Sequence, residues 1–384
     1  MKKVFLWLVI FSMIAVFSLA GCKQQAATTT AAETTAAAET TAAAETTAAA
    51  ETTAAAETTA AAEDQMDTPM GSGTIYYLAP EMLGSVQVLY MQLHKEYGEK
   101  LGYKVIELVA GNQASEQLRQ LDDAIAQKPA AILLNAVDSK TVTAGVEKAQ
   151  AAGIKVIDFA RVLTEGTYSF TSTLSTVKMG EMGGKEVVRL LKEKYGEEKG
   201  VVLEVMGDAG DNYAVLLNQG FKSIIDQYPN IELISKNTPQ WETINTVNIV
   251  TDNFTARQDI DAIFIHWDGR VPWIFPVLES KGFKKGDIKI VSTDGTPEGL
   301  QMIRDGWLES TVNFPVYELT YGPWIWMDEI LADEEINLGK VNVLKLECEL
   351  VKENTGVTLL VPGAMTTKVD VDDPSLWANF KVEE

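Results

Sequence analysis

The 384-residue sequence predicts an α/β fold with two lobes, each built on a doubly wound parallel sheet. From Thr74 onward, short apolar runs alternate with amphipathic segments of helical length, and the connections between them are short. Such strand–helix–strand repetition is typical of parallel sheets that helices cover on both faces. Residues 71–384 are also long enough for two domain-sized cores.

The apolar runs give the expected strands, at residues 74–78, 104–109, 130–134, 155–159, 201–206, 231–235, 262–265 and 288–292. Helices are expected at residues 115–127, 141–151, 179–194, 213–227 and 273–280. In the first of these, Leu118, Leu121 and Ile125 share one face. His94 lies among Leu93, Lys95 and Glu96, and we expect it on the surface of a further helix.

The first residues are built like a secretory signal. Lys2 and Lys3 precede an apolar run over residues 4–20, which ends in Leu-Ala-Gly-Cys. This ending resembles the lipobox of bacterial lipoproteins. The resemblance implies a signal peptide over residues 1–21, cleavage before Cys22 and acylation of the Cys22 thiol. The alternative is an ordinary signal that is cleaved after Ala20.

A low-complexity segment follows. Residues 34–63 are five copies of Thr-Thr-Ala-Ala-Ala-Glu, without an aromatic or a branched aliphatic residue. Such a composition cannot bury a core. We therefore interpret residues 22–72 as a lipidated cysteine followed by a linker.

Composition excludes several classes of function. The formal net charge of −22 repels phosphate backbones, so we expect no nucleic-acid partner. With Cys22 acylated, Cys348 has no partner for a disulfide. The sequence has no Cys-x-x-Cys, Gly-x-Ser-x-Gly or Gly-x-x-x-x-Gly-Lys motif. We expect no metal, no cofactor and no catalytic residue.

Polar and aromatic residues follow the predicted strands where each one ends. Open parallel sheets bind ligands beyond the carboxyl ends of their strands. We therefore expect a binding cleft there, with a lining that suits a small polar solute. The residues at these ends include Asn135, Arg161, Trp267, Asp268 and Asp294.

Several motifs together resemble one family. They are the run 151–157 followed by Arg161, Gly220-Phe221 after a Gly-Asp-Ala-Gly turn, the strand 261–264, the run 291–298 and the tail 367–377. In combination they are similar to the sugar-type substrate-binding proteins of ABC importers, the ribose and galactose binding protein class. The resemblance covers residues 73–380.

The resemblance implies the type I periplasmic binding protein fold, in which three crossover segments form a hinge. We place the crossings near Ser175, near Phe314 and around Leu338. Lobe I then comprises residues 73–175 and 315–337. Lobe II comprises residues 176–314, and residues 338–384 join it as the C-terminal tail.

The resemblance also assigns site residues. Arg161 and Asp294 are expected to hold the polar edge of a ligand, with Asp268 and Asn135 nearby. The rings of Trp267, Phe314 and either Tyr76 or Tyr77 are expected to stack on its apolar face. Trp241 matches a family position outside the ligand contacts, so we expect it to pack in the protein. The family's Asp beside the arginine is replaced by Ala160, which argues against a ligand identical to ribose or galactose.

The sequence thus predicts a lipid-anchored, monomeric receptor outside the bacterial cell membrane. It captures a small carbohydrate or similar polar solute, catalyses nothing and delivers the solute to an ABC transporter permease. Three alternatives stay open. They are a receptor for a sensor system with a nucleoside or autoinducer-like ligand, a surface-anchored glycoside hydrolase, and a structural or adhesive lipoprotein.

Overall fold

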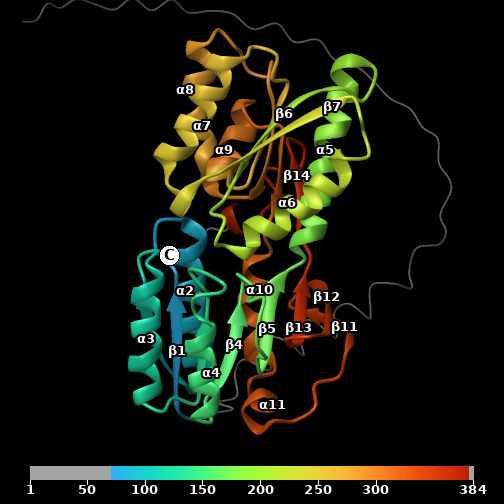
Figure 1. Cartoon of the computed structure of the whole chain (residues 1–384). Coiled ribbons are helices and arrows are strands. Elements are labelled where there is room, and N and C mark those ends of the chain that lie inside the picture. The colour runs from blue at the N-terminus through green and yellow to red at the C-terminus, as the bar shows by residue number, and fades with distance from the viewer. Residues whose placement is uncertain (1–70, 380–384) are drawn as a thin grey trace, which may run out of the picture. The chain divides into compact units, whose positions relative to one another are not determined.

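The computed structural model describes residues 71–379 and shows the two predicted parallel-sheet lobes (Figure 1). The predicted signal peptide, Cys22 and the repeats lie outside the described residues. Within residues 71–379, no helix is long and apolar enough to cross a membrane.

Lobe I contains an eight-stranded sheet in the order β11-β12-β13-β5-β4-β3-β1-β2. Its strands are β1 (Thr74–Ala79), β2 (Lys104–Val109), β3 (Ala131–Leu134), β4 (Lys155–Phe159), β5 (Phe170–Leu174), β11 (Gly339–Val343), β12 (Leu346–Glu353) and β13 (Gly356–Val361). Its helices are α2 (Ser85–Lys100), α3 (Ala114–Ala126), α4 (Thr143–Ala151), α10 (Val316–Ile325) and α11 (Met327–Ala332). The strands are parallel except at one edge, where β12 pairs antiparallel with both β11 and β13.

Lobe II contains a six-stranded sheet in the order β14-β10-β9-β8-β6-β7. Its strands are β6 (Gly200–Met206), β7 (Ile231–Asn237), β8 (Ala262–Ile265), β9 (Lys289–Asp294), β10 (Ser310–Asn313) and β14 (Ala364–Thr367). Its α-helices are α5 (Thr176–Tyr195), α6 (Asn212–Ile225), α7 (Thr243–Ala256), α8 (Val271–Ser280) and α9 (Pro297–Asp305). Three short 3₁₀ turns, η1 (Pro239–Trp241), η2 (Asp268–Arg270) and η3 (Trp377–Asn379), complete the described chain.

Helices cover both faces of each sheet, as the sequence predicts. In lobe I, α2 and α10 pack on one face, and α3 and α4 lie on the other, where Leu78 and Leu121 share a core cluster. In lobe II, α5 and α6 cover one face with Phe221 stacked on Phe264. Helices α7, α8 and α9 cover the opposite face around Phe254.

Helices α5 and α6 approach each other through glycines. A Cβ atom on Gly220 would lie 2.0 Å from the backbone oxygen of Val177, and one on Gly180 would lie 2.1 Å from that of Leu217. Neither position has room for a side chain, because the obstacle is backbone. This close crossing fixes the positions of α5 and α6, the two helices that cover one face of the lobe II sheet.

The expectation that His94 lies on a surface is wrong. The side chain is fully buried because α10 covers this face of α2, and its Nδ1 accepts a hydrogen bond from Trp324 Nε1 at 3.1 Å. Burial lowers the pKa of His94 to about 3, so the ring is neutral at pH 7. His94 is a core residue of lobe I.

The C-terminal region differs from the prediction. Residues 339–361 were expected with lobe II, yet they form β11, β12 and β13 in the sheet of lobe I, where β13 pairs parallel with β5. Only β14 joins lobe II, antiparallel to β10. The chain therefore passes between the lobes after β5, after β10 and between β13 and β14, so the crossing expected around Leu338 lies at residues 362–363 instead.

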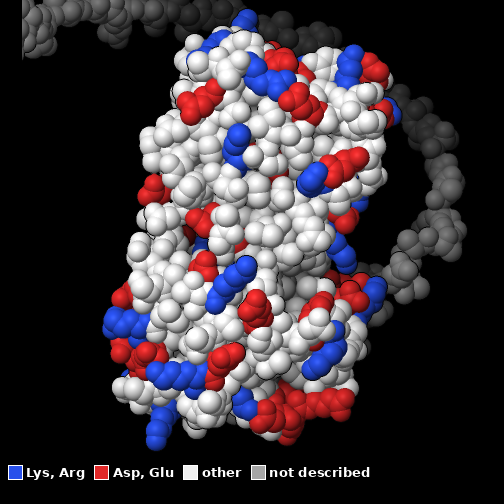
Figure 2. All heavy atoms as spheres, viewed as in Figure 1, with Lys and Arg blue, Asp and Glu red and all other residues white. Residues whose placement is uncertain are grey.

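Charged side chains of both signs are mixed on the face shown in Figure 2. Lys and Arg lie next to Asp and Glu there and form no continuous basic patch. The described salt bridges are mostly of this surface kind, such as Arg189 with Glu186 and Glu193 on α5. Exposed pairs of this type contribute little to stability.

Candidate functional site

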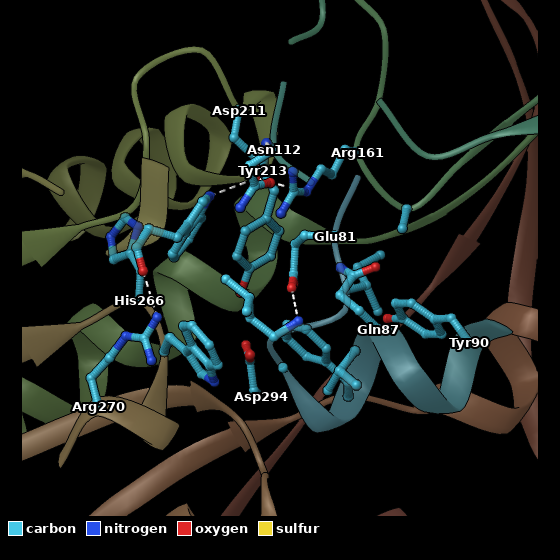
Figure 3. Close-up of a pocket in the computed structure, with 18 residues that line it drawn as sticks. Glu81, Gln87, Tyr90, Asn112, Arg161, Asp211, Tyr213, His266, Arg270 and Asp294 are labelled. Carbon is cyan, nitrogen blue, oxygen red and sulfur yellow. Dashed lines mark hydrogen bonds and ion pairs between the residues drawn. The ribbon is translucent and has the colours of Figure 1, made fainter. Parts of the chain in front are cut away.

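The candidate site is a cavity lined by both lobes (Figure 3). Lobe I contributes the β1–α2 loop, the first turns of α2, the residues after β2 and β4 and the end of β5. Lobe II contributes the residues after β6, β7, β8 and β10 and the last residue of β9. The lining residues are Glu81, Leu83, Gly84, Val86, Gln87, Tyr90, Asn112, Ala160, Arg161, Leu174, Asp211, Tyr213, Trp241, His266, Trp267, Arg270, Asp294 and Phe314. The cavity thus lies beyond the carboxyl ends of parallel strands, where the sequence predicts a cleft.

The cavity is small. The centres of water molecules have access to about 80 Å³ of it. It fits one small solute.

Unusual backbone conformations gather around this cavity. Of the described non-glycine residues with positive φ, Asn112 (57°), Ala160 (61°), Gln240 (55°), Trp241 (55°) and Asp294 (99°) line it or directly precede a lining residue. Left-handed backbone is unfavourable for Ala, Gln and Trp, less so for Asn and Asp, and it persists where surrounding contacts impose it. Here it turns the chain at strand ends and thereby positions Arg161, Trp241 and Asp294.

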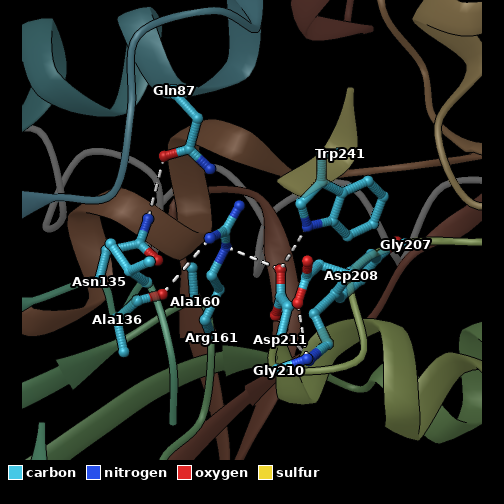
Figure 4. A network of polar contacts seen from close by, with 12 residues as sticks. Gln87, Asn135, Ala136, Ala160, Arg161, Gly207, Asp208, Gly210, Asp211 and Trp241 are labelled. Atoms are coloured by element: carbon cyan, nitrogen blue, oxygen red, sulfur yellow. Dashed lines mark hydrogen bonds and ion pairs between the residues drawn. The ribbon is translucent and has the colours of Figure 1, made fainter. Parts of the chain in front are cut away.

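An ion pair joins the lobes at one end of the cavity (Figure 4). Arg161 follows β4 of lobe I, and its Nε lies 2.9 Å from Oδ2 of Asp211 in lobe II. The Arg161 Nη1 also donates to the backbone oxygen of Ala136 at 3.4 Å. Asp211 precedes α6, where its Oδ1 accepts from the backbone N–H of Tyr213 at 2.9 Å, and Trp241 Nε1 donates to its Oδ2 at 3.1 Å. The buried Asp211 carboxylate thus connects α6 and η1 of lobe II to Arg161 of lobe I.

Aromatic rings of lobe II form another part of the cavity wall, next to the ion pair. Trp241 and Trp267 meet edge to face with ring centroids 6.5 Å apart, and Tyr213 meets Phe314 in the same way at 5.6 Å. The Arg270 guanidinium lies 3.6 Å from the Trp267 ring centroid and donates to the backbone oxygen of Trp241. Such rings present flat apolar surface to a ligand.

Asp294 carries the least satisfied charge of the site. Its Oδ1 accepts only a long hydrogen bond from Thr293 Oγ1 at 3.3 Å, and the carboxyl group faces the cavity in Figure 3. Burial, and next the charge of Asp268, raise the pKa of Asp294 well above its usual value. A ligand that donates hydrogen bonds would supply the missing partners.

Burial also shifts the pKa values of Glu81, Asp211 and Arg270 in the direction that favours their neutral forms. It raises the pKa of Glu81, and also that of Asp211, where the Arg161 charge opposes the effect. It lowers the pKa of Arg270 to about 10. A low-dielectric cavity of this kind strengthens each hydrogen bond that a ligand makes in it.

The structure brings together four of the predicted ligand-binding residues. Arg161, Asp294, Trp267 and Phe314 all line the cavity. Asn135 lies behind it, where its Nδ2 donates to Oε1 of the lining residue Gln87 at 3.0 Å.

Three predicted residues do not reach the cavity. Asp268 is fully buried, and its carboxylate accepts hydrogen bonds from the backbone N–H groups of Gly295 and Thr296 and from the hydroxyls of Thr296 and Thr311. It therefore holds the turn after β9. Tyr76 and Tyr77 lie within β1 and point into the two opposite cores of lobe I, so neither ring can stack on a ligand here.

Sequence reasoning missed several lining residues. Gln87 and Tyr90 belong to the first turns of α2, and Arg270 and Tyr213 also lie on helical segments that start at the cavity. Trp241 lines the cavity although we expected it to pack elsewhere. The missed signal is that helices which follow parallel strands begin at the same edge of the sheet as the cleft.

The described part of the chain contains no group of three or more His, Cys, Asp or Glu side chains placed to hold a metal ion. His266 lines the cavity but is engaged within lobe II, because its Nδ1 accepts from the Gly207 N–H and its Nε2 lies 3.0 Å from Glu204. Its position in lobe II is therefore structural.

Comparison with known proteins gives a consistent result. The periplasmic binding protein domain family matches residues 90–335. The ribose import binding protein of Escherichia coli is 28% identical over 214 residues, which cover 56% of this chain and 70% of that protein. The D-apiose import binding protein of Paraburkholderia graminis is 26% identical over 216 residues, 56% of this chain and 67% of that protein.

Solved structures show the same fold. A carbohydrate transporter solute binding protein from Agrobacterium radiobacter, in complex with D-arabinose, superposes with a TM-score of 0.70 at 19% identity. The match covers 81% of this chain and all of that one.

Proposed function

Because the chain belongs to the periplasmic binding protein domain family, we propose that it is the extracytoplasmic receptor of an ABC importer and captures a small neutral carbohydrate or polyol. The observation that carries the proposal is the cavity between the lobes, with hydrogen-bonding groups at Arg161 and Asp294 and flat rings at Trp241 and Trp267. A sugar or polyol offers hydroxyls to the first pair and C–H surface to the second. The names of the relatives, which import ribose and apiose, support this class of ligand.

Capture takes place by hinge closure in this proposal. The three connections at residues 174–176, 313–316 and 361–364 let the lobes move as bodies. Arg161 and Asp211 then meet across the cleft and enclose the solute. Enclosure excludes water from the cavity, which strengthens the hydrogen bonds between the protein and the ligand. The ligand then stays bound until it is delivered.

The size of the cavity narrows the ligand class. A cavity volume of about 80 Å³ favours one small solute, such as a monosaccharide or a shorter polyol, over a disaccharide. The family consists of binding proteins, and neither a hydrolase nor a purely structural role is favoured.

The test is a thermal-shift screen of the full chain with D-ribose, D-xylose, D-galactose, myo-inositol, glycerol, adenosine and sucrose. A bound sugar should stabilise the protein by about 2.7 kcal/mol at a concentration of 100 Kd, growing with the logarithm of concentration. We expect a shift with at least one monosaccharide or polyol and none with sucrose. A shift with adenosine alone would favour the nucleoside receptor, and no shift at all would contradict the proposal.

Delivery requires that the receptor stay near its permease. We propose that Cys22 carries the lipid anchor and that the receptor works as a monomer. Labelled palmitate should enter the chain in bacteria, and the Cys22→Ser variant should lose the label and leave the membrane fraction. Label that persists in Cys22→Ser would contradict the anchor at this residue.

A further inference from the structure

The ligand preference of the cavity depends on how its charges are paired. Three carboxyl groups line it, on Glu81, Asp211 and Asp294, against two guanidinium groups, on Arg161 and Arg270. Among the described residues, Arg161 is already paired with an anion, whereas Arg270 contacts a ring and a backbone oxygen and has no carboxylate within ion-pair distance. Arg161 faces Asp211 at 2.9 Å, and Arg270 lies over the Trp267 ring while its Nη2 donates to a backbone oxygen.

Asp211 is the residue that neutralises Arg161. Its side chain is 1% exposed, and that of Arg161 is 11% exposed, so water screens the pair only weakly. Two further donors, the backbone N–H of Tyr213 and Trp241 Nε1, fix the carboxylate in place. In Figure 4 the guanidinium lies between Asp211 on one side and Ala136 on the other. A ligand therefore meets an arginine whose charge is already compensated.

We propose that Asp211 determines the specificity of the receptor by making it reject anionic sugars in favour of their neutral counterparts. This inference rests on the proposed function. A sugar carboxylate would add a fourth acidic group to Glu81, Asp211 and Asp294 in a cavity with two guanidinium groups, one of which Asp211 already pairs, and an excess of like charge in a buried site is unfavourable. A neutral sugar needs no counter-charge. In this proposal, the preference for neutral sugars comes from the repulsion of anionic ligands as much as from the hydrogen bonds that the cavity makes to sugar hydroxyls.

Removal of the Asp211 charge should raise the affinity of the cavity for anionic sugars. In Asp211→Asn the guanidinium of Arg161 loses its partner and can pair with a ligand carboxylate, for which its planar fork is well suited. The asparagine oxygen can still accept from the Tyr213 N–H, so the start of α6 keeps its cap.

The experiment compares matched probes by calorimetry on the full chain. The neutral probe is the sugar with the largest shift in the screen above, and the anionic probe is the uronate that carries a carboxylate on the same pyranose ring, D-galacturonate for D-galactose or D-glucuronate for D-xylose. In the wild type the acid should bind at least about tenfold more weakly. In Asp211→Asn, the ratio of the dissociation constant of the acid to that of the neutral sugar should shrink by about tenfold or more.

Two further variants control the result. Asp226→Asn removes one negative charge from the exposed C-terminal end of the same helix, where Asp226 pairs with Lys222, and should leave the ratio unchanged. Asp211→Ser retains a capping oxygen without charge and replaces Asp211→Asn if that variant does not fold.

The outcomes separate the two proposals. If Asp211→Asn keeps the wild-type ratio, or if the wild type already prefers the acid, Asp211 does not set the preference, while sugar binding itself stands. If no neutral sugar binds the wild type, the proposed function fails and this inference falls with it.

Discussion

Asp294→Ala should weaken binding of the neutral sugar by about 10- to 150-fold and leave the melting temperature of the unliganded protein nearly unchanged. Hydrogen bonds to a charged acceptor contribute about 1.5–3 kcal/mol each, and Asp294 faces the cavity with its carboxyl group hardly satisfied. Its backbone is fixed by contacts that the substitution retains, since the Asp294 carbonyl accepts from the Phe314 N–H and from Trp377 Nε1, both at 3.0 Å. Isothermal titration calorimetry measures the loss.

Glu298→Ala is the matched control for this variant. Glu298 is an exposed carboxylate in the first turn of α9, four positions further along the chain and outside the cavity, so its removal should not change affinity. Arg161→Ala should weaken binding as well, because it removes a donor and leaves the buried Asp211 without its cation. Unchanged affinity in both Asp294→Ala and Arg161→Ala would show that the ligand binds elsewhere.

Gly220→Ala should lower the free energy of unfolding by about 3 kcal/mol or more, the upper range for an overpacked core. The new Cβ would lie 2.0 Å from the Val177 oxygen, and the obstacle is the backbone of α5, which cannot rotate away as a side chain can. The helices must move apart, and the Phe221–Phe264 stack beneath them must loosen. Urea denaturation followed by circular dichroism measures the change as a lower midpoint.

The neighbouring residue provides the control. Gln219 is exposed on α6, so Gln219→Ala alters the same helix without touching α5 and should change stability by less than about 0.5 kcal/mol. Equal stability of Gly220→Ala and Gln219→Ala would mean that α5 and α6 have room between them that the distances do not show.

The sequence predicts the strands of the apolar runs up to β9 and misses the hydroxyl-rich strands β5 and β10 and the C-terminal strands β11, β12, β13 and β14. All eight strands expected from apolar runs exist, from β1 to β9 without β5. The missed strands β5 and β10 contain Ser and Thr at buried positions, for example Ser172 and Thr311. Their hydroxyls are satisfied by long-range partners, since Ser172 donates to the Leu319 carbonyl and Thr311 to Asp268. Hydrophobic periodicity cannot reveal a strand whose buried groups bond to distant segments.

The same limit applies to the site. Arg161 and Asp294 were predicted because they follow strands directly, where the carboxyl ends of a parallel sheet meet. Asp211 contacts Trp241 and Arg161 only through the fold, across 30 and 50 positions of the chain respectively. Tyr77 was misplaced because it lies inside a strand that helices cover on both faces, which its position in the sequence does not reveal. Pairings of this kind require the structure.

The late strands β13 and β14 have a consequence for the biosynthesis of the protein. In lobe I, β5 obtains its outer neighbour only from residues 356–361, and in lobe II, β10 obtains its own only from residues 364–367. A chain that the ribosome has extended to residue 350 therefore has two sheets with unpaired edges, although most of both cores has been made. Neither lobe can finish folding before almost the entire polypeptide has been synthesised. For a protein that functions outside the cytoplasm, this delay keeps the chain incompletely folded until translation is nearly over, the form that a secretion channel can thread.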